Sequence, residues 1–135
     1  MVTQQHEISG GMQDTITRIQ SLIQTKKVTK QGTPESWRYG GKELEAEMER
    51  LRTNLRLHGG YKVLGCNVFH FESGANINNP TKRLLMIPVN GAPTRDTPSG
   101  EPLLSNSYYY TEDDQLLFGE GWDIILAALA EKSTS

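Results

Sequence analysis

The sequence predicts an α+β protein with two N-terminal helices, then an antiparallel sheet of three to five strands, then a C-terminal helix packed on the sheet or at an interface. Three observations lead to this prediction. Two stretches repeat apolar residues at helical spacing, the segment after them reads as extended strands, and the chain shows no strand–helix alternation of the kind that builds a parallel sheet. We expect a single domain over residues 1–135, with 1–9 and 133–135 as flexible ends.

Two amphipathic helices are predicted, over residues 12–24 and 42–57. Each repeats its apolar residues at successive spacings of four, three and four, which places them on one face of a helix. The glycine pair at 59–60 is a typical stop signal for the second helix. We expect the two apolar faces to pack on each other, through Met12, Ile16, Ile19, Ile23, Leu44, Met48, Leu51 and Leu55.

The strands are predicted from alternation and from turn residues. Residues 25–41 are long for a structureless connection, so a short hairpin is expected around residues 32–34. Residues 61–72 are apolar on both strand faces, which is typical of a central strand, and they are expected to form a long hairpin with residues 84–89. Two shorter strands are predicted over residues 103–111 and 115–118.

Residues 122–132 (WDIILAALAEK) read as a final helix that is apolar on most of its circumference. A short helix of this kind cannot bury all of its apolar surface alone, so it lies deep against the sheet or meets a second copy. We favour a homo-oligomer, with a two-fold dimer as the default, over a monomer whose helix fills the core. The candidate interface residues are Trp122, Ile125, Leu126 and Leu129.

The formal net charge of −2 conceals an uneven distribution. Residues 1–95 hold 13 Lys and Arg against 8 Asp and Glu, whereas residues 96–135 hold 1 against 8. The two portions can neutralise each other within one fold or between subunits. With one cysteine, no apolar run long enough to span a bilayer and no signal-peptide pattern, the sequence predicts a cytoplasmic protein.

Motifs for catalysis and cofactor binding fit this sequence poorly. Gly40-Gly41-Lys42 is followed by Glu43, where a phosphate-binding loop needs Ser or Thr. Cys66 and His70 share a strand face, but four residues of strand separate them by about 13 Å, too far to bind one zinc ion. We therefore expect no metal and no cofactor, and binding in preference to catalysis.

The richest signal is a set of side chains suited to recognition. Arg and Tyr are enriched at binding hot spots, and Arg makes bidentate contacts to carboxylate or phosphate. Ordinary sheet composition is the alternative explanation, because Tyr is a favoured strand residue. The candidate ligand-binding residues are Trp37, Arg38, Arg83, Asn90, Arg95, Asp96, Tyr108 and Tyr110.

These observations predict a non-enzymatic binding or interaction domain that self-associates and recognises a protein partner or ligand through Arg- and Tyr-bearing loops and strands. The alternative is a protein that binds or sequesters a nucleotide or another phosphate-bearing small molecule. A small hydrolase is the third hypothesis. A membrane is not expected as a partner, and neither is nucleic acid, because the sequence lacks a dense block of Lys and Arg.

Overall fold

The computed structural model describes residues 3–59, 62–95, 100–104 and 107–130. Within those ranges the chain forms two helices and ten strands. In chain order they are β1 Thr3–Glu7, α1 Gly10–Gln24, β2 Thr29–Gly32, β3 Ser36–Gly40, α2 Lys42–Gly59, β4 Val63–Phe71, β5 Ala75–Ile77, β6 Leu84–Asn90, β7 Thr94–Arg95, β8 Ser107–Thr111, β9 Gln115–Phe118 and β10 Trp122–Leu129.

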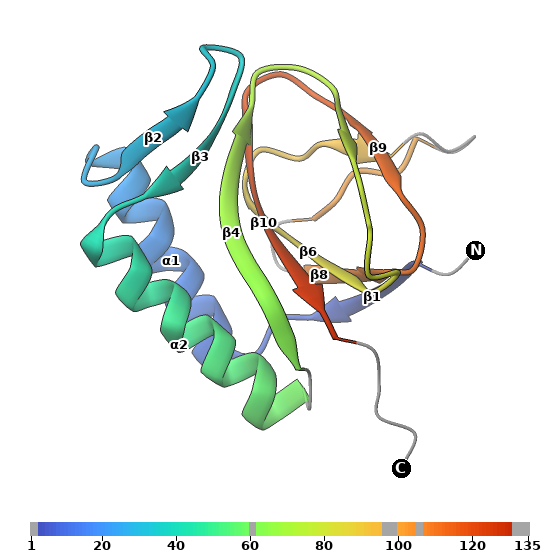
Figure 1. Cartoon of the computed structure of the whole chain (residues 1–135), viewed down its shortest axis with the longest axis horizontal. Coiled ribbons are helices and arrows are strands. Elements are labelled where there is room, and N and C mark those ends of the chain that lie inside the picture. The colour runs from blue at the N-terminus through green and yellow to red at the C-terminus, as the bar shows by residue number, and fades with distance from the viewer. Residues whose placement is uncertain (1–2, 60–61, 96–99, 105–106, 131–135) are drawn as a thin grey trace.

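The elements form three layers (Figure 1). The central layer is an antiparallel sheet in the order β1-β8-β6-β10-β4-β3-β2, and a smaller sheet has the order β5-β9-β7. Helices α1 and α2 pack on each other and cover one face of the large sheet, through contacts to β6, β4 and β3. The small sheet lies on the opposite face (Figure 1).

Each interface between layers has its own apolar core. The core under the helices combines Ile16, Leu51, Cys66, Val68 and Ile125 with their neighbours. The core under the small sheet combines residues from both sheets, namely Ile77, Leu84, Met86, Leu103, Tyr109, Leu117, Trp122 and Ile124. Strand β10 contributes to both cores, because successive strand residues point to opposite faces.

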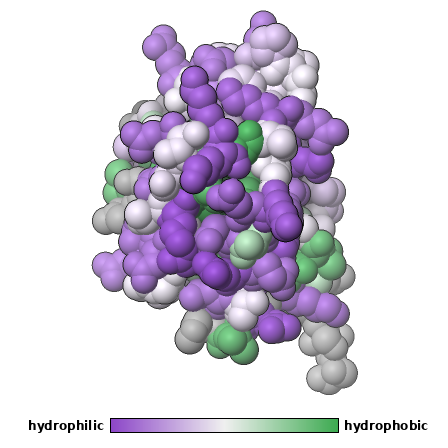
Figure 2. Space-filling model, turned by 90° about the vertical axis from the view of Figure 1, so that its left-hand side faces the viewer, coloured by the Kyte–Doolittle hydropathy of each residue, from purple (hydrophilic) through white to green (hydrophobic). Residues whose placement is uncertain are grey.

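The two helices form where the sequence predicts them, and their predicted apolar faces are buried except at Ile23, which is partly buried. Ser9 caps α1, since its side chain accepts a hydrogen bond from the Met12 amide at 3.3 Å. Ile16, Ile19 and Leu51 are completely buried. Figure 2 looks onto the side of the molecule that carries the helices, and this surface is mainly hydrophilic, as expected for helices that turn their apolar stripes inward.

The predicted C-terminal helix is wrong. Residues 122–129 form β10, which lies between β4 and β6 at the centre of the large sheet. A strand that is covered on both faces reads as a continuous apolar run, without the alternation that would have identified it. The alanines at 127 and 128 also favour a helix in isolation, and tertiary packing overrides that preference.

The position of β10 changes two further expectations. Trp122 and Leu126 face the core under the small sheet, whereas Ile125 and Leu129 face the core under the helices. The four candidate interface residues therefore do not share a surface, and the apolar area that favoured a homo-oligomer is covered within the chain. In addition, β4 and β6 do not form the predicted hairpin, because each pairs with β10 instead.

The predicted count of three to five strands is also too small. Strands β5 and β7 hold three and two residues, which is too short to produce a readable alternation. Residues 3–7, assigned from the sequence to the flexible N-terminus, form β1 and pair with β8. Within the part of the chain that the structure describes, neither helix is both long and apolar enough to cross a membrane.

Candidate recognition site

One end of the large sheet is left open by the small sheet. On the face opposite the helices, Trp122 and Ile124 of β10 are completely covered. Their neighbours on β4, Phe71 and Phe69, are only half-buried. Arg38 of β3, the next residue across, is exposed. The cover therefore ends at β4, and the face over β4, β3 and β2 is accessible.

A shallow cleft of about 320 Å³ lies over this open end of the sheet. We call it the recognition cleft, and it is lined by Gln31, Ser36, Trp37, Arg38, Phe69 and Phe71. Strand register explains why these residues meet, since Gln31 pairs with Arg38 and Arg38 pairs with Phe69. Ser36 pairs with Phe71 in the same way. The two phenylalanines stack with their ring centroids 6.3 Å apart.

The hairpin that carries Trp37 and Arg38 is the one predicted around residues 32–34. The Thr33 amide donates to the Ser36 carbonyl at 2.8 Å, and the Thr33 hydroxyl accepts from the amides of Glu35 and Ser36. Gly32 has a φ of 151°, and a Cβ there would lie 2.5 Å from the Ser36 carbonyl oxygen. Glycine is therefore required at the turn that sets the β2–β3 register.

Arg38 carries the charge of the recognition cleft. Its Nη2 donates to Gln31 Oε1 at 2.7 Å, which is a bond to a neutral amide. Among the described residues, Arg38 forms no ion pair with a carboxylate. An exposed guanidinium beside two aromatic rings is therefore available to a ligand.

On the opposite face of the same strands lies a row of polar and aromatic groups that we call the polar row. Register places Trp37 opposite His70, His70 opposite Asp123, and Asp123 opposite Asn90, so the row crosses four strands. Asp123 is buried and accepts hydrogen bonds from Tyr39 Oη at 2.9 Å and Asn90 Nδ2 at 2.9 Å. His70 Nδ1 lies 2.8 Å from the same carboxylate. The buried carboxylate is thus surrounded by partners.

Stacking continues the polar row toward the edge of the sheet. The indole of Trp37 lies on the imidazole of His70 with ring centroids 4.1 Å apart. Lys30 of β2 places its Nζ 4.4 Å from the centroid of the Trp37 ring. The second His70 nitrogen, Nε2, is 2.5 Å from Glu72 Oε1. Because Trp37 contacts both Lys30 and His70, and both ring nitrogens of His70 are bonded, the polar row fixes the position of the β3 strand under Arg38.

The polar row is poorly arranged for catalysis. Both ring nitrogens of His70 face carboxylates, so neither is directed at a nucleophile or at open space. Burial, together with the Asp123 carboxylate, raises the pKa of Tyr39 well above 10, so its phenol stays protonated. Burial likewise raises the pKa of Cys66 to about 12, which makes the thiol unreactive. In the described part of the chain, no group of His, Cys, Asp and Glu side chains could hold a metal ion.

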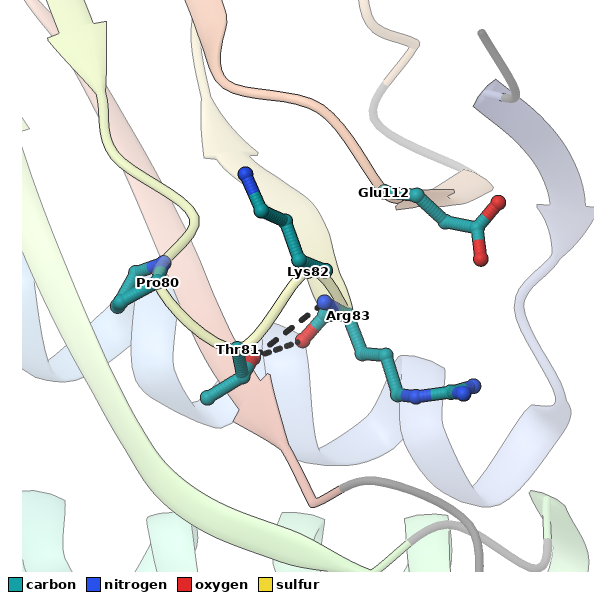
Figure 3. A pocket seen from close by; sticks show the side chains of 5 residues that line it. All are labelled: Pro80, Thr81, Lys82, Arg83 and Glu112. Atoms are coloured by element: carbon teal, nitrogen blue, oxygen red, sulfur yellow. Dashed lines mark hydrogen bonds between the residues drawn. The ribbon is translucent and has the colours of Figure 1, made fainter.

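Arg83 lines a second pocket of about 460 Å³, together with Pro80, Thr81, Lys82 and Glu112. Arg83 Nη1 lies 3.5 Å from the Tyr110 hydroxyl. Figure 3 shows that the charged ends of Lys82 and Arg83 point in different directions from the turn between β5 and β6. These cations do not converge on one anion, so this pocket lacks the geometry of a phosphate site.

The remaining predicted residues are dispersed. Arg95 lies over the Tyr109 ring at 5.7 Å and bonds to Glu101, and Tyr108 stacks on His6. Asn90 belongs to the polar row. Asp96 lies outside the described residues. Of the eight candidates, Arg38 and Trp37 line the recognition cleft, but the Trp37 ring stacks on His70 in the polar row on the other face.

Sequence reasoning missed the aromatic floor of the recognition cleft and the core of the polar row. Phe69 and Phe71 were assigned to a strand covered on both faces, and no pattern showed that the cover stops at β4. Asp123 was placed on a helix, so its contact with His70 could not be anticipated. The alternation Phe69–His70–Phe71 was the available signal, because it sets aromatic and polar side chains on opposite faces.

Comparison with known proteins adds no assignment: the chain matches no protein-family model and no curated protein sequence.

Proposed function

We propose that this chain is a non-catalytic binding domain whose recognition cleft takes a ligand with a carboxylate next to an apolar or aromatic group. The observation that carries this proposal is the position of Arg38. Its guanidinium is exposed beside Phe69 and Phe71 and, within the described residues, has a neutral partner rather than a carboxylate.

The chemistry of the recognition cleft selects the ligand class. A planar guanidinium matches a carboxylate through two parallel hydrogen bonds. The half-buried rings of Phe69 and Phe71 offer apolar area that a ligand would cover, which strengthens binding. Among its described lining residues the cleft has one cation, Arg38, so a singly charged anion suits it better than a phosphate dianion. Its open, shallow form suits a side chain or a chain segment rather than an enclosed small molecule.

Binding is favoured over catalysis because the acid–base groups near the recognition cleft are already engaged. His70 is held between Asp123 and Glu72, and Tyr39 donates to Asp123. Their arrangement supports a rigid platform under the cleft. The free thiol of Cys66 fits a reducing compartment, so the cytoplasm remains the proposed location.

The proposal is tested with phenylacetate, which combines a carboxylate and an aromatic ring. Titration into ¹⁵N-labelled protein should shift the amide signals of Arg38, Phe69 and Phe71 in a saturable way. Phenylacetamide, which lacks the charge, should bind more weakly. The Arg38→Gln variant should lose about threefold to fivefold in affinity, the range expected for an exposed ion pair.

The matched control is Arg56→Gln, which removes an exposed arginine of α2, the helix that covers the opposite face of the sheet from the cleft. It should leave the phenylacetate affinity unchanged. Equal shifts with phenylacetamide, or shifts that map away from the recognition cleft, would contradict the proposal. Tighter binding of phenyl phosphate than of phenylacetate would overturn the carboxylate assignment in favour of a phosphate-bearing ligand.

A further inference from the structure

Strand β2 forms one edge of the large sheet, beside the recognition cleft. All four of its residues are exposed. Within the described residues, β3 is the strand that pairs with β2, and no strand pairs with its outer edge. An exposed edge presents backbone N–H and C=O groups that can accept an additional strand.

The register of the β2–β3 hairpin shows which backbone groups face outward. The bond from the Thr33 amide to the Ser36 carbonyl marks these two residues as a hydrogen-bonded pair. Hydrogen-bonded and non-hydrogen-bonded pairs alternate along an antiparallel ladder. Gln31 and Thr29 therefore direct their backbone groups toward β3, whereas Lys30 directs its N–H and C=O toward the free edge.

The charge around this edge is strongly one-sided. Residues 26–40 carry four cationic side chains, Lys26, Lys27, Lys30 and Arg38, against one carboxylate, Glu35. None of the four cations forms an ion pair with a described carboxylate. Arg38 also reaches over β2, because its guanidinium bonds to the Gln31 side chain. A carboxylate on an added strand opposite Gln31 would come within reach of that guanidinium.

We propose that β2 accepts an acidic, extended peptide segment of a partner protein as an additional strand of the large sheet. This inference rests on the proposed function, because Arg38 serves both the recognition cleft and the added strand. A second copy of this chain is a poorer occupant, since pairing two β2 strands would bring the lysines of both copies together along one edge. The other edge of the sheet, β1, contains Glu7 and no Lys or Arg, so an acidic segment is directed to β2.

The probe is a short, end-capped, fluorescently labelled peptide of alternating Thr and Glu, followed by anisotropy at low ionic strength. Matched peptides carry Gln or Lys in place of Glu. The Glu peptide should bind about tenfold more tightly than the Gln peptide, and the Lys peptide should not bind measurably. Equal binding of the Glu and Gln peptides would overturn the inference.

Backbone pairing is separated from charge by two variants at one position. Lys30→Pro removes the outward N–H and the charge, whereas Lys30→Gln removes the charge alone. Lys30→Gln should weaken Glu-peptide binding a few-fold, and Lys30→Pro should abolish it. Equal losses in the two variants would show that the peptide is held by charge without strand pairing, which contradicts the inference.

Two further measurements keep the outcome clear if Lys30→Pro disturbs the hairpin. In the unmodified chain, the Glu peptide should slow amide hydrogen exchange at Lys30 and leave exchange in β1 unchanged. Protection at β1 instead would refute the assignment to β2.

Phenylacetate titration of Lys30→Pro tests the recognition cleft separately. Retained phenylacetate shifts together with lost peptide binding would support the inference and leave the proposed function intact. A dimer mass by light scattering without peptide would identify a second copy as the occupant and overturn the inference.

Discussion

The two faces of the β2–β3–β4 end of the sheet use the same strands in opposite ways. On the helix-bearing face, the polar row pairs a buried carboxylate with Tyr39, His70 and Asn90. On the other face, the guanidinium of Arg38 bonds to the Gln31 amide and has no described carboxylate beside it. Adjacent residues of β3, Trp37 and Arg38, thus belong to different environments.

This difference separates groups that stabilise the fold from groups available to a ligand. A buried charge must be paired, because leaving it unpaired in the interior is costly. An exposed charge remains solvated and needs no internal partner, so its lack of one has little effect on stability. The comparison predicts large stability changes on the face of the polar row and small ones on the face of the recognition cleft.

The largest effect is expected for Asp123→Ala. The substitution leaves the Tyr39 hydroxyl, the His70 ring and the Asn90 amide without their shared acceptor in a buried region. We expect a loss of about 3 kcal/mol in the free energy of unfolding, the order found when one partner of a buried charged network is removed. Urea denaturation followed by circular dichroism measures it.

The control for that substitution is Asp14→Ala, which changes an exposed carboxylate on α1. It should alter the free energy of unfolding by no more than about 0.5 kcal/mol. If Asp123→Ala were as mild as Asp14→Ala, the polar row would not contribute to stability, and the contrast between the two faces would be lost.

A smaller effect, counted per ionising group and per pH unit, is expected at alkaline pH on the helix-bearing face. Burial raises the pKa of Cys66 from about 9 to about 12, and the pKa of Tyr39 is raised above its usual 10 by burial and by Asp123. The folded state therefore holds both protons more tightly than the unfolded chain does. Their stabilising contribution is complete below pH 9 and is lost as the pH rises above it.

Each thiol or phenol that ionises only on unfolding lowers stability by about 1.4 kcal/mol per pH unit. Urea denaturation between pH 8 and pH 11 measures the slope. Cys66→Ala should flatten the wild-type slope from pH 9 upward, and Tyr39→Phe should flatten it from pH 10 upward. Parallel slopes in wild type and both variants would show that neither proton is held by burial.

The sequence predicted those parts of the fold whose burial is one-sided. The apolar stripes of α1 and α2 are readable because each helix buries one face, as Ile16 and Leu51 do. Strand β10 is covered on both faces by the helices and the small sheet, so Ile124 and Ile125 are equally buried and the strand period disappears. The loss of the period, rather than weak apolar character, caused the error.

The sequence predicted the site residues that lie within one strand, but it did not predict which residues of other strands they contact. Trp37 and Arg38 were identified as a recognition cluster from residue type alone. Their partners depend on register, which joins Arg38 to Phe69 and Trp37 to His70. Side chains from strands about thirty positions apart in the sequence meet only after the direct pairing of β3 with β4 is fixed, and residue type alone does not reveal that register.

The smallest stability effect, and the sharpest test of the comparison, is expected for Arg38→Gln. Arg38 is exposed and bonds to a neutral amide, so its loss should change the free energy of unfolding by no more than about 0.5 kcal/mol. The same variant should lose phenylacetate and Glu-peptide affinity, because the charge that recognises the carboxylate is gone. Urea denaturation and the two binding titrations on one preparation measure both quantities.

A loss of stability as large as that of Asp123→Ala would show that Arg38 supports the fold, and its exposed charge could then no longer be assigned to a ligand. Unchanged stability with reduced affinity would support the proposed contrast, in which one face holds its charge for the fold and the other presents it to a ligand.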